Sequence, residues 1–130
     1  MKKEKEYIAY QGNKYTIEWY YDEKDYSQTL AYFEKLSPKR QDKVFYLFSR
    51  MADFGIISDL TKFRNEADGI YAFKPQPDRF LCFFFRGNKI IVTNAFEKQQ
   101  EKLPVQEKRK ALACKTQYEI RLTEGTYYDT

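Results

Sequence analysis

The feature that most constrains this chain is a series of strand-forming segments between Gly69 and Pro104. Segments 70–74, 79–86 and 89–96 are rich in aromatic and β-branched residues, and short turn sequences separate them. Strands joined by short turns pair antiparallel. The middle segment is apolar at every position from Phe80 to Phe85, as expected of a strand covered on both faces. The stretch 70–96 therefore predicts an antiparallel sheet with this segment at its centre.

The part of the chain before this sheet predicts a β-hairpin over 7–21 and then a pair of helices over 26–54. The second helix has clear boundaries, because Ser37 is a good N-cap and Pro38 suits the first helical position. Gly55 is its expected C-terminal stop. A short link between the two helices favours an antiparallel helical hairpin.

Two less regular segments complete the chain. Residues 56–68 are interpreted as a connector in which Leu60 and Phe63 pack inward. A last helix is predicted over 104–115. Residues 118–122 fit either a short strand or the end of that helix, and 125–130 a loose tail.

These elements fit one domain, residues 1–130, because the length suits a single core and the aromatic share of 18% supplies ample apolar surface. Strands, a helix pair, strands and a helix in this order indicate an α+β fold. We expect a small antiparallel or mixed sheet with the helices packed against one side of it.

Composition excludes several classes of protein. The chain has no histidine, which excludes enzymes that depend on a catalytic His, such as Ser-His-Asp hydrolases. Cys82 and Cys114 are too far apart for a metal-binding motif, so we expect buried thiols, no metal and no cofactor. The N-terminus does not resemble a signal peptide, and the longest apolar run is too short to span a membrane. The expected location is the cytoplasm.

The net charge of +4 permits a nucleic-acid partner without requiring one. Lys74 and Arg79 flank the predicted turn at 75–78, and Lys98 follows the neighbouring strand. Each of these cations, taken alone, also fits an ordinary solvated surface residue. Together they would suit an RNA phosphate, because Lys and Arg can stabilise the transition state when a 2′-hydroxyl attacks the adjacent phosphate.

At these residues the sequence resembles the RelE/HigB superfamily of toxin–antitoxin toxins, in its phage-derived HigB-like branch. The resemblance covers roughly Leu30 to Ala111. Its motifs stand here as Leu36-Ser37-Pro38, Ile70-Tyr71-Ala72-Phe73-Lys74, Asp78-Arg79-Phe80-Leu81-Cys82-Phe83, Phe96-Glu97-Lys98-Gln99 and Pro104.

The resemblance implies a RelE-like toxin that enters the ribosomal A site and cleaves mRNA. A cognate antitoxin, often a helix-turn-helix protein, would hold it inactive. By position, Arg79 matches the arginine that contacts the scissile phosphate, Lys74 stands where the family has Arg, and Lys98 matches the first Lys of Phe-x-Lys-Lys. Three positions depart from the pattern, namely Ala72, Asp78 and Gln99.

Further residues are candidates for contact with RNA. The predicted RNA-binding set is Lys62, Arg64, Gln99, Lys102, Lys108 and Arg109. Those in the last helix belong to a basic face that also includes Lys110 and Lys115, and helix solvation explains such a face equally well. Candidates for a proton donor, or for a ring that stacks on an RNA base, are Tyr118, Tyr127 and Tyr128.

The sequence thus leaves three functions open. The first is a ribosome-dependent endoribonuclease toxin that needs no metal. The second is a non-catalytic regulator on the same fold that binds RNA or protein, which the Ala72 and Gln99 departures favour. The third is a purely structural phage protein.

Overall fold

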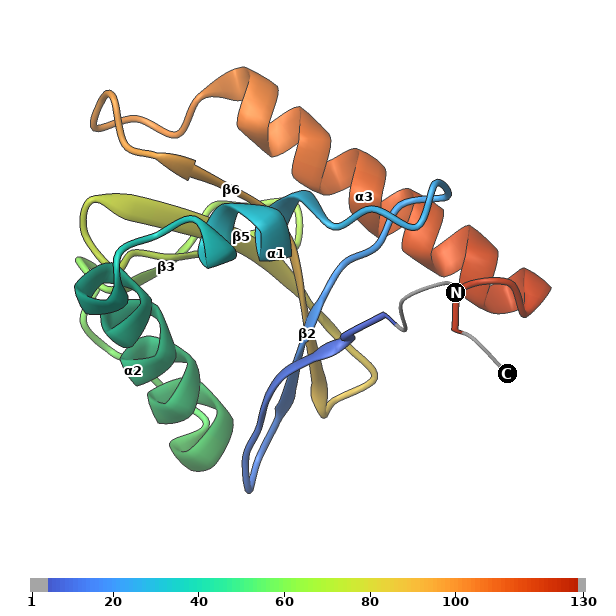
Figure 1. Cartoon of the computed structure of the whole chain (residues 1–130), viewed down its shortest axis with the longest axis horizontal. Helices are drawn as coiled ribbons and strands as arrows, with labels where there is room; N and C mark the ends of the chain where they lie inside the picture. Colours follow the sequence, from blue (N-terminus) through green and yellow to red (C-terminus); the bar gives the residue numbers. More distant parts are fainter. Residues whose placement is uncertain (1–4, 129–130) are drawn as a thin grey trace.

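A computed structural model describes residues 5–128 and shows an α+β fold, as predicted (Figure 1). In chain order the elements are β1 (Ile8–Gln11), β2 (Thr16–Trp19), α1 (Gln28–Glu34), α2 (Pro38–Phe54), β3 (Phe63–Asn65), β4 (Tyr71–Phe73), β5 (Asp78–Phe85), β6 (Lys89–Glu97) and α3 (Val105–Glu124). Among residues 5–128, no helix combines the length and apolar character needed to cross a membrane.

The six strands form one mixed sheet in the order β1-β2-β6-β5-β4-β3. Every neighbouring pair is antiparallel except β2 and β6, which run parallel. This parallel pair joins the N-terminal hairpin to the central strands, so the hairpin and the sheet predicted over 70–96 are one structure. The strand β5 lies inside the sheet, as its continuous apolar run predicted.

Helices cover both faces of this sheet, so the expectation that they pack against one side was wrong. Helices α1 and α2 bury one face in a core that includes Trp19, Phe48 and Phe80. Helix α3 covers the other face, where Phe83 and Tyr118 are buried (Figure 1). The reason is that successive strand residues point to opposite faces, and both sets of β5 side chains are apolar.

Local capping explains why α2 has the bounds that the sequence predicted. The Ser37 side chain accepts a hydrogen bond from the amide of Arg40, and Pro38 occupies the first turn. Gly55 ends the helix at a φ of 84°, a left-handed conformation that favours glycine. Helix α1 is capped in the same way by Ser27 and is shorter than expected.

The C-terminal part differs most from the prediction. Helix α3 continues to Glu124, past the expected end at 115, so 118–122 is helical and not a strand. The segment after it is anchored, because Tyr127 is buried and its hydroxyl accepts a hydrogen bond from the amide of Tyr21. The expectation of a loose tail over 125–130 is therefore wrong for 125–128, and 129–130 lie outside the described residues.

The connector also holds more structure than expected. Residues Phe63–Asn65 form the edge strand β3, which pairs antiparallel with β4. Phe63 packs into the core as predicted, whereas Leu60 is exposed. The strand has three residues, two of them polar, so it carries no recognisable alternation of its own.

Candidate functional site

Lys74, Arg79 and Lys98 come together in one small hollow at the rim of the sheet. They follow or begin three adjacent strands, at the end of β4, the start of β5 and the end of β6. The amide of Lys98 donates to the Pro77 carbonyl over 2.9 Å, which ties the end of β6 to the turn before β5. We call this the Arg79 hollow; its lining includes Glu66, Ala72, Lys74, Arg79, Lys98, Gln100, Glu101 and Lys102.

Arg79 is the most buried cation of the hollow. Its Nη1 donates to the side-chain oxygen of Gln76 over 3.2 Å and to the carbonyl of Asp78 over 3.0 Å. Among residues 5–128, no carboxylate lies within ion-pair distance of it. Burial lowers its pKa from the usual value, yet a guanidinium remains protonated under all physiological conditions. A buried cation held by neutral acceptors favours binding of an anion.

Lys74 lies beside Arg79 and differs from it chemically. Its Nζ donates to the Leu60 carbonyl over 3.2 Å. Burial, and secondarily the positive charge of Arg79, lower the pKa of the Lys74 amine below its usual value. A lysine in this environment can exchange a proton more readily than a solvated one.

Lys98 is paired with a carboxylate that the sequence gave no reason to single out. Its Nζ lies 2.6 Å from Oε1 of Glu101, and this hydrogen bond lowers the pKa of Glu101. In the structure it lines the hollow together with Lys74 and Arg79, so it partly balances their charge.

Two of the departures from the family pattern have clear positions. Ala72 is buried and lines the hollow, so the floor there has no polar side chain. Gln99 is exposed and does not line the hollow, whereas Gln100 does. The strand β6 ends at Glu97, and the irregular segment after it decides which side chains face inward.

The third departure, Asp78, is a structural anchor. Its carboxylate is fully buried on the side of the sheet opposite Arg79, where it accepts hydrogen bonds from the Tyr32 hydroxyl and the Arg40 guanidinium. Arg40 also reaches Glu97 over 3.0 Å. This network fixes the start of α2 to the ends of β5 and β6, directly behind the hollow.

A basic groove adjoins the Arg79 hollow and shares Glu66, Lys102 and Leu103 with it. It has a volume of about 480 Å³, and we call it the Arg64 groove. Four of the six predicted RNA-binding residues line it, namely Arg64, Lys102, Lys108 and Arg109. Lys108 is paired with Asp68 over 2.8 Å. The cationic surface therefore continues from the hollow onto the first turns of α3.

Comparison with known protein families shows which family the chain belongs to. Residues 31–116 match the family described as phage-derived protein Gp49-like, which is about two thirds of the chain. The chain belongs to the Gp49-like family. This family is grouped with the RelE/HigB-like toxins, in agreement with the resemblance at the sequence level. No curated protein matches the chain.

The matched segment of this Gp49-like protein contains every residue of the Arg79 hollow and the Arg64 groove. Lys62, also predicted to bind RNA, lines neither of them. It borders a different groove, between α2 and the turn at Pro75 and Gln76. The predicted RNA-binding set thus divides, with Lys62 and Gln99 apart from the other four.

The tyrosines considered as proton donors are at the wrong end of the Gp49-like sheet. Tyr128 donates to the buried Glu18 over 2.7 Å and accepts from Lys89 at the start of β6. Tyr118 and Tyr127 pack in the same cluster. Since β6 spans about 26 Å from Lys89 to its other end, these rings cannot reach Lys98. Their role is to anchor the C-terminal segment.

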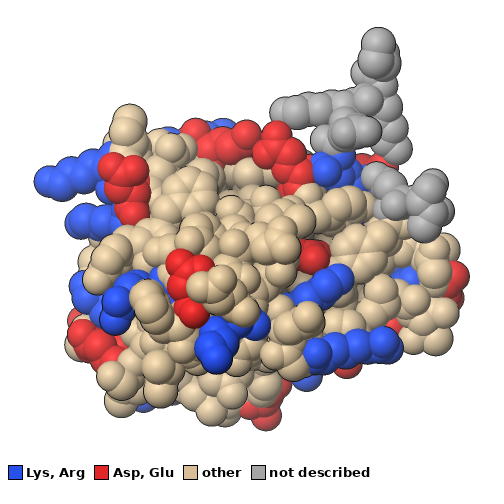
Figure 2. Space-filling model, turned by 90° about the horizontal axis from the view of Figure 1, so that it is seen from below, with Lys and Arg blue, Asp and Glu red and all other residues tan. Residues whose placement is uncertain are grey.

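One further face of the Gp49-like protein carries charges of both signs. Figure 2 shows the face seen from below, where single cations alternate with carboxylates over wide uncharged areas. Within residues 5–128, no group of three or more His, Cys, Asp or Glu side chains is placed to hold a metal ion.

Proposed function

We propose that this Gp49-like protein is the toxin of a type II toxin–antitoxin system of the HigB-like branch, and that it cleaves mRNA on the ribosome. The observation that carries the proposal is the meeting of Lys74, Arg79 and Lys98 in one hollow that opens onto a basic groove. Membership of the Gp49-like family supports the toxin assignment. The proposed location is the cytoplasm, because the protein would act on translating ribosomes there.

The chemistry needs neither metal nor cofactor. The scissile phosphate would lie at the mouth of the hollow, where Arg79 stabilises the negative charge that builds up on the phosphorane. Lys74, with its lowered pKa, would accept the proton of the 2′-hydroxyl as that oxygen attacks phosphorus. Lys98 would donate a proton to the departing 5′-oxygen. The products are a 2′,3′-cyclic phosphate and a 5′-hydroxyl.

The Arg64 groove would bind the RNA backbone next to the cleaved bond. Asn94 donates to the Glu107 side chain over 3.0 Å, which holds the start of α3 against β6 and so positions Lys108 and Arg109. Contacts of this type release counterions, so binding should weaken steeply with salt. The cognate antitoxin, expected to be a helix-turn-helix protein, would hold the activity off.

A second function has a specific observation in its favour. Ala72 gives the hollow an apolar floor, and Glu101 neutralises Lys98. A regulator that binds RNA or a protein without cutting it would need no more than this. It would bind RNA with the same salt dependence and yield no new RNA ends.

A translating extract separates the two functions. Wild-type protein is added, and the 5′ ends of the mRNA are mapped. The proposal predicts new 5′-hydroxyl ends within translated codons, reduced about 100-fold or more by Arg79→Ala. Lys35→Ala, an exposed cation at the end of α1, is the matched control and should leave cleavage unchanged. RNA binding without new 5′ ends would favour the regulator. Full cleavage by an Arg79→Ala, Lys74→Ala variant would show that the Arg79 hollow is not the catalytic site.

A further inference from the structure

Exposed apolar side chains concentrate on one part of the surface, away from the Arg79 hollow. Nine large hydrophobic residues among the described ones are exposed, and five of these belong to α2 or to the connector after it: Phe45, Tyr46, Phe54, Ile56 and Leu60. All but Phe45 are between 62% and 68% exposed. A gathering of this kind is typical of a surface that another molecule covers.

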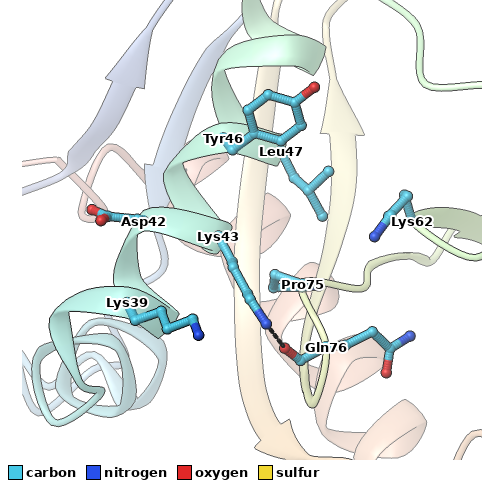
Figure 3. Close-up of a pocket in the computed structure, with 8 residues that line it drawn as sticks. All are labelled: Lys39, Asp42, Lys43, Tyr46, Leu47, Lys62, Pro75 and Gln76. Carbon is cyan, nitrogen blue, oxygen red and sulfur yellow. Dashed lines mark hydrogen bonds between the residues drawn. The ribbon is translucent and has the colours of Figure 1, made fainter.

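Two of these side chains, Tyr46 and Ile56, line a continuous depression beside α2. Its first part has a volume of about 510 Å³ and lies between α2 and the turn that contains Pro75 and Gln76, with Tyr46 and Leu47 on its wall (Figure 3). A second part of about 350 Å³ shares Tyr46, Leu47 and Lys62 with the first and continues to Ile56. We call the whole the α2 groove.

The charges around the α2 groove are mainly positive. Lys39, Lys43 and Lys62 point toward the groove from both sides in Figure 3, and Arg50 lies further along α2. Of the carboxylates between residues 5 and 128, only those of Asp42 and Asp59 line it. The surplus of cations around apolar walls favours an occupant with apolar anchors and negative flanks.

We propose that the α2 groove is the docking surface for an acidic amphipathic helix of a partner protein. The groove follows α2 from Lys39 to Arg50, which is about 16 Å of helix, so an occupant of about three helical turns matches its length. A helix of that length can place apolar side chains at i, i+3, i+4 and i+7 in the groove and acidic side chains beside the cations at its edges. The proposal holds whether or not the chain cleaves RNA.

The groove also touches a residue that holds the central cation of the Arg79 hollow. Gln76, on its wall, accepts the hydrogen bond of Arg79 Nη1, and its carbonyl accepts from Lys43 over 3.4 Å. A helix seated in the groove would therefore contact the support of Arg79.

A selection with displayed helices tests the docking surface on the full chain. The library is a 14-residue helix with Leu or Phe fixed on one face and Glu, Lys or Ser allowed at all other positions. We expect Glu-rich helices to be enriched. Their binding should weaken at least 10-fold for a Tyr46→Ser, Ile56→Ser variant, because both side chains line the groove. It should remain unchanged for the control Tyr26→Ser, Ile120→Ser, which alters exposed apolar positions elsewhere. Thermal melting verifies that both variants are folded.

A charge-reversal arm makes the test stricter. Lys43→Glu, Lys62→Glu should shift the enriched sequences from Glu to Lys. In amide NMR spectra, the enriched helix should move the signals of Gln76 and Arg79, which needs no catalysis and so stands apart from the cleavage assay. The proposal is overturned if no helix is enriched, if Lys-rich helices are the ones enriched on the wild type, or if the Tyr46→Ser, Ile56→Ser variant binds equally well. It is also overturned if that variant instead loses binding of a 12-nucleotide RNA, since the groove would then be an RNA-binding site.

Discussion

The buried carboxylate of Asp78 makes Arg40→Met an informative change. Asp78 is fully buried, and Arg40 is the cation paired with it, while Tyr32 supplies a neutral hydrogen bond. Removing one partner of a buried ion pair costs about 3–5 kcal/mol, because the other charge stays in the interior. The Arg40 side chain is 31% exposed and Tyr32 remains, so we expect the lower end, about 3 kcal/mol. For a domain of this size that corresponds to a fall in Tm of about 12 °C.

Thermal and urea unfolding followed by circular dichroism measure this loss. Arg50→Met is the matched control on the same helix, because its guanidinium lies over the exposed ring of Phe54 and not against a buried charge; it should change stability by less than about 0.5 kcal/mol. Adding Asp78→Asn to Arg40→Met should recover at least about 1 kcal/mol, since the orphaned charge is removed. A loss below 1 kcal/mol for Arg40→Met, or no recovery in the double variant, would refute the reasoning.

Three further predictions concern the tail, a thiol and the pH profile. Tyr127→Phe removes the hydroxyl that accepts the Tyr21 amide hydrogen, so urea unfolding should show a loss of about 1–2 kcal/mol; unchanged stability would contradict an anchored tail. Cys82 is fully buried and burial raises the pKa of its thiol, so iodoacetamide at pH 8 should alkylate it, by intact mass, only after unfolding; labelling of the native protein would contradict this. Burial and Arg79 lower the pKa of Lys74, so the neutral amine that a base requires forms at lower pH than in free lysine. RNA cleavage should therefore rise with pH up to that lowered pKa, and Lys74→Arg should flatten the rise; a rate that falls with pH over the same range would contradict this role.

Elements with local boundary signals were predictable from the sequence. Helix α2 begins and ends where Ser37, Pro38 and Gly55 indicate, because capping is a property of neighbouring residues. The central position of β5 followed from its apolar run. The same run should also have indicated helices on both faces, since a strand that is apolar on both sides needs cover on both.

Elements that depend on distant partners were not predictable. The parallel pairing of β2 with β6 joins segments about 70 residues apart, and nothing in either strand specifies it. The end of α3 was missed because its buried positions, among them Ala111 and Tyr118, are widely spaced, so the apolar stripe is weak. The anchoring of Tyr127 by the Tyr21 amide is equally non-local.

The residues of the candidate site were also predictable where the signal is local and unpredictable where it depends on distant partners. Strand parity and the short turn brought Lys74 and Arg79 onto one face, which the sequence could indicate. Glu101 borders the hollow only because the irregular segment between β6 and α3 lines it together with Arg79. Likewise, Asp78 acquires its role from Arg40, a residue on a different element. Side chains that act through partners far along the chain need the structure to reveal them.

If Arg79 and its neighbouring cations cleave mRNA, a translating extract must contain new 5′ ends, and mapping them is the decisive measurement. We expect 5′-hydroxyl ends within translated codons for the wild type and for Lys35→Ala, and a loss of about 100-fold or more for Arg79→Ala. Ends that persist undiminished in Arg79→Ala, or an absence of ends in the wild type while ribosomes translate, would contradict it.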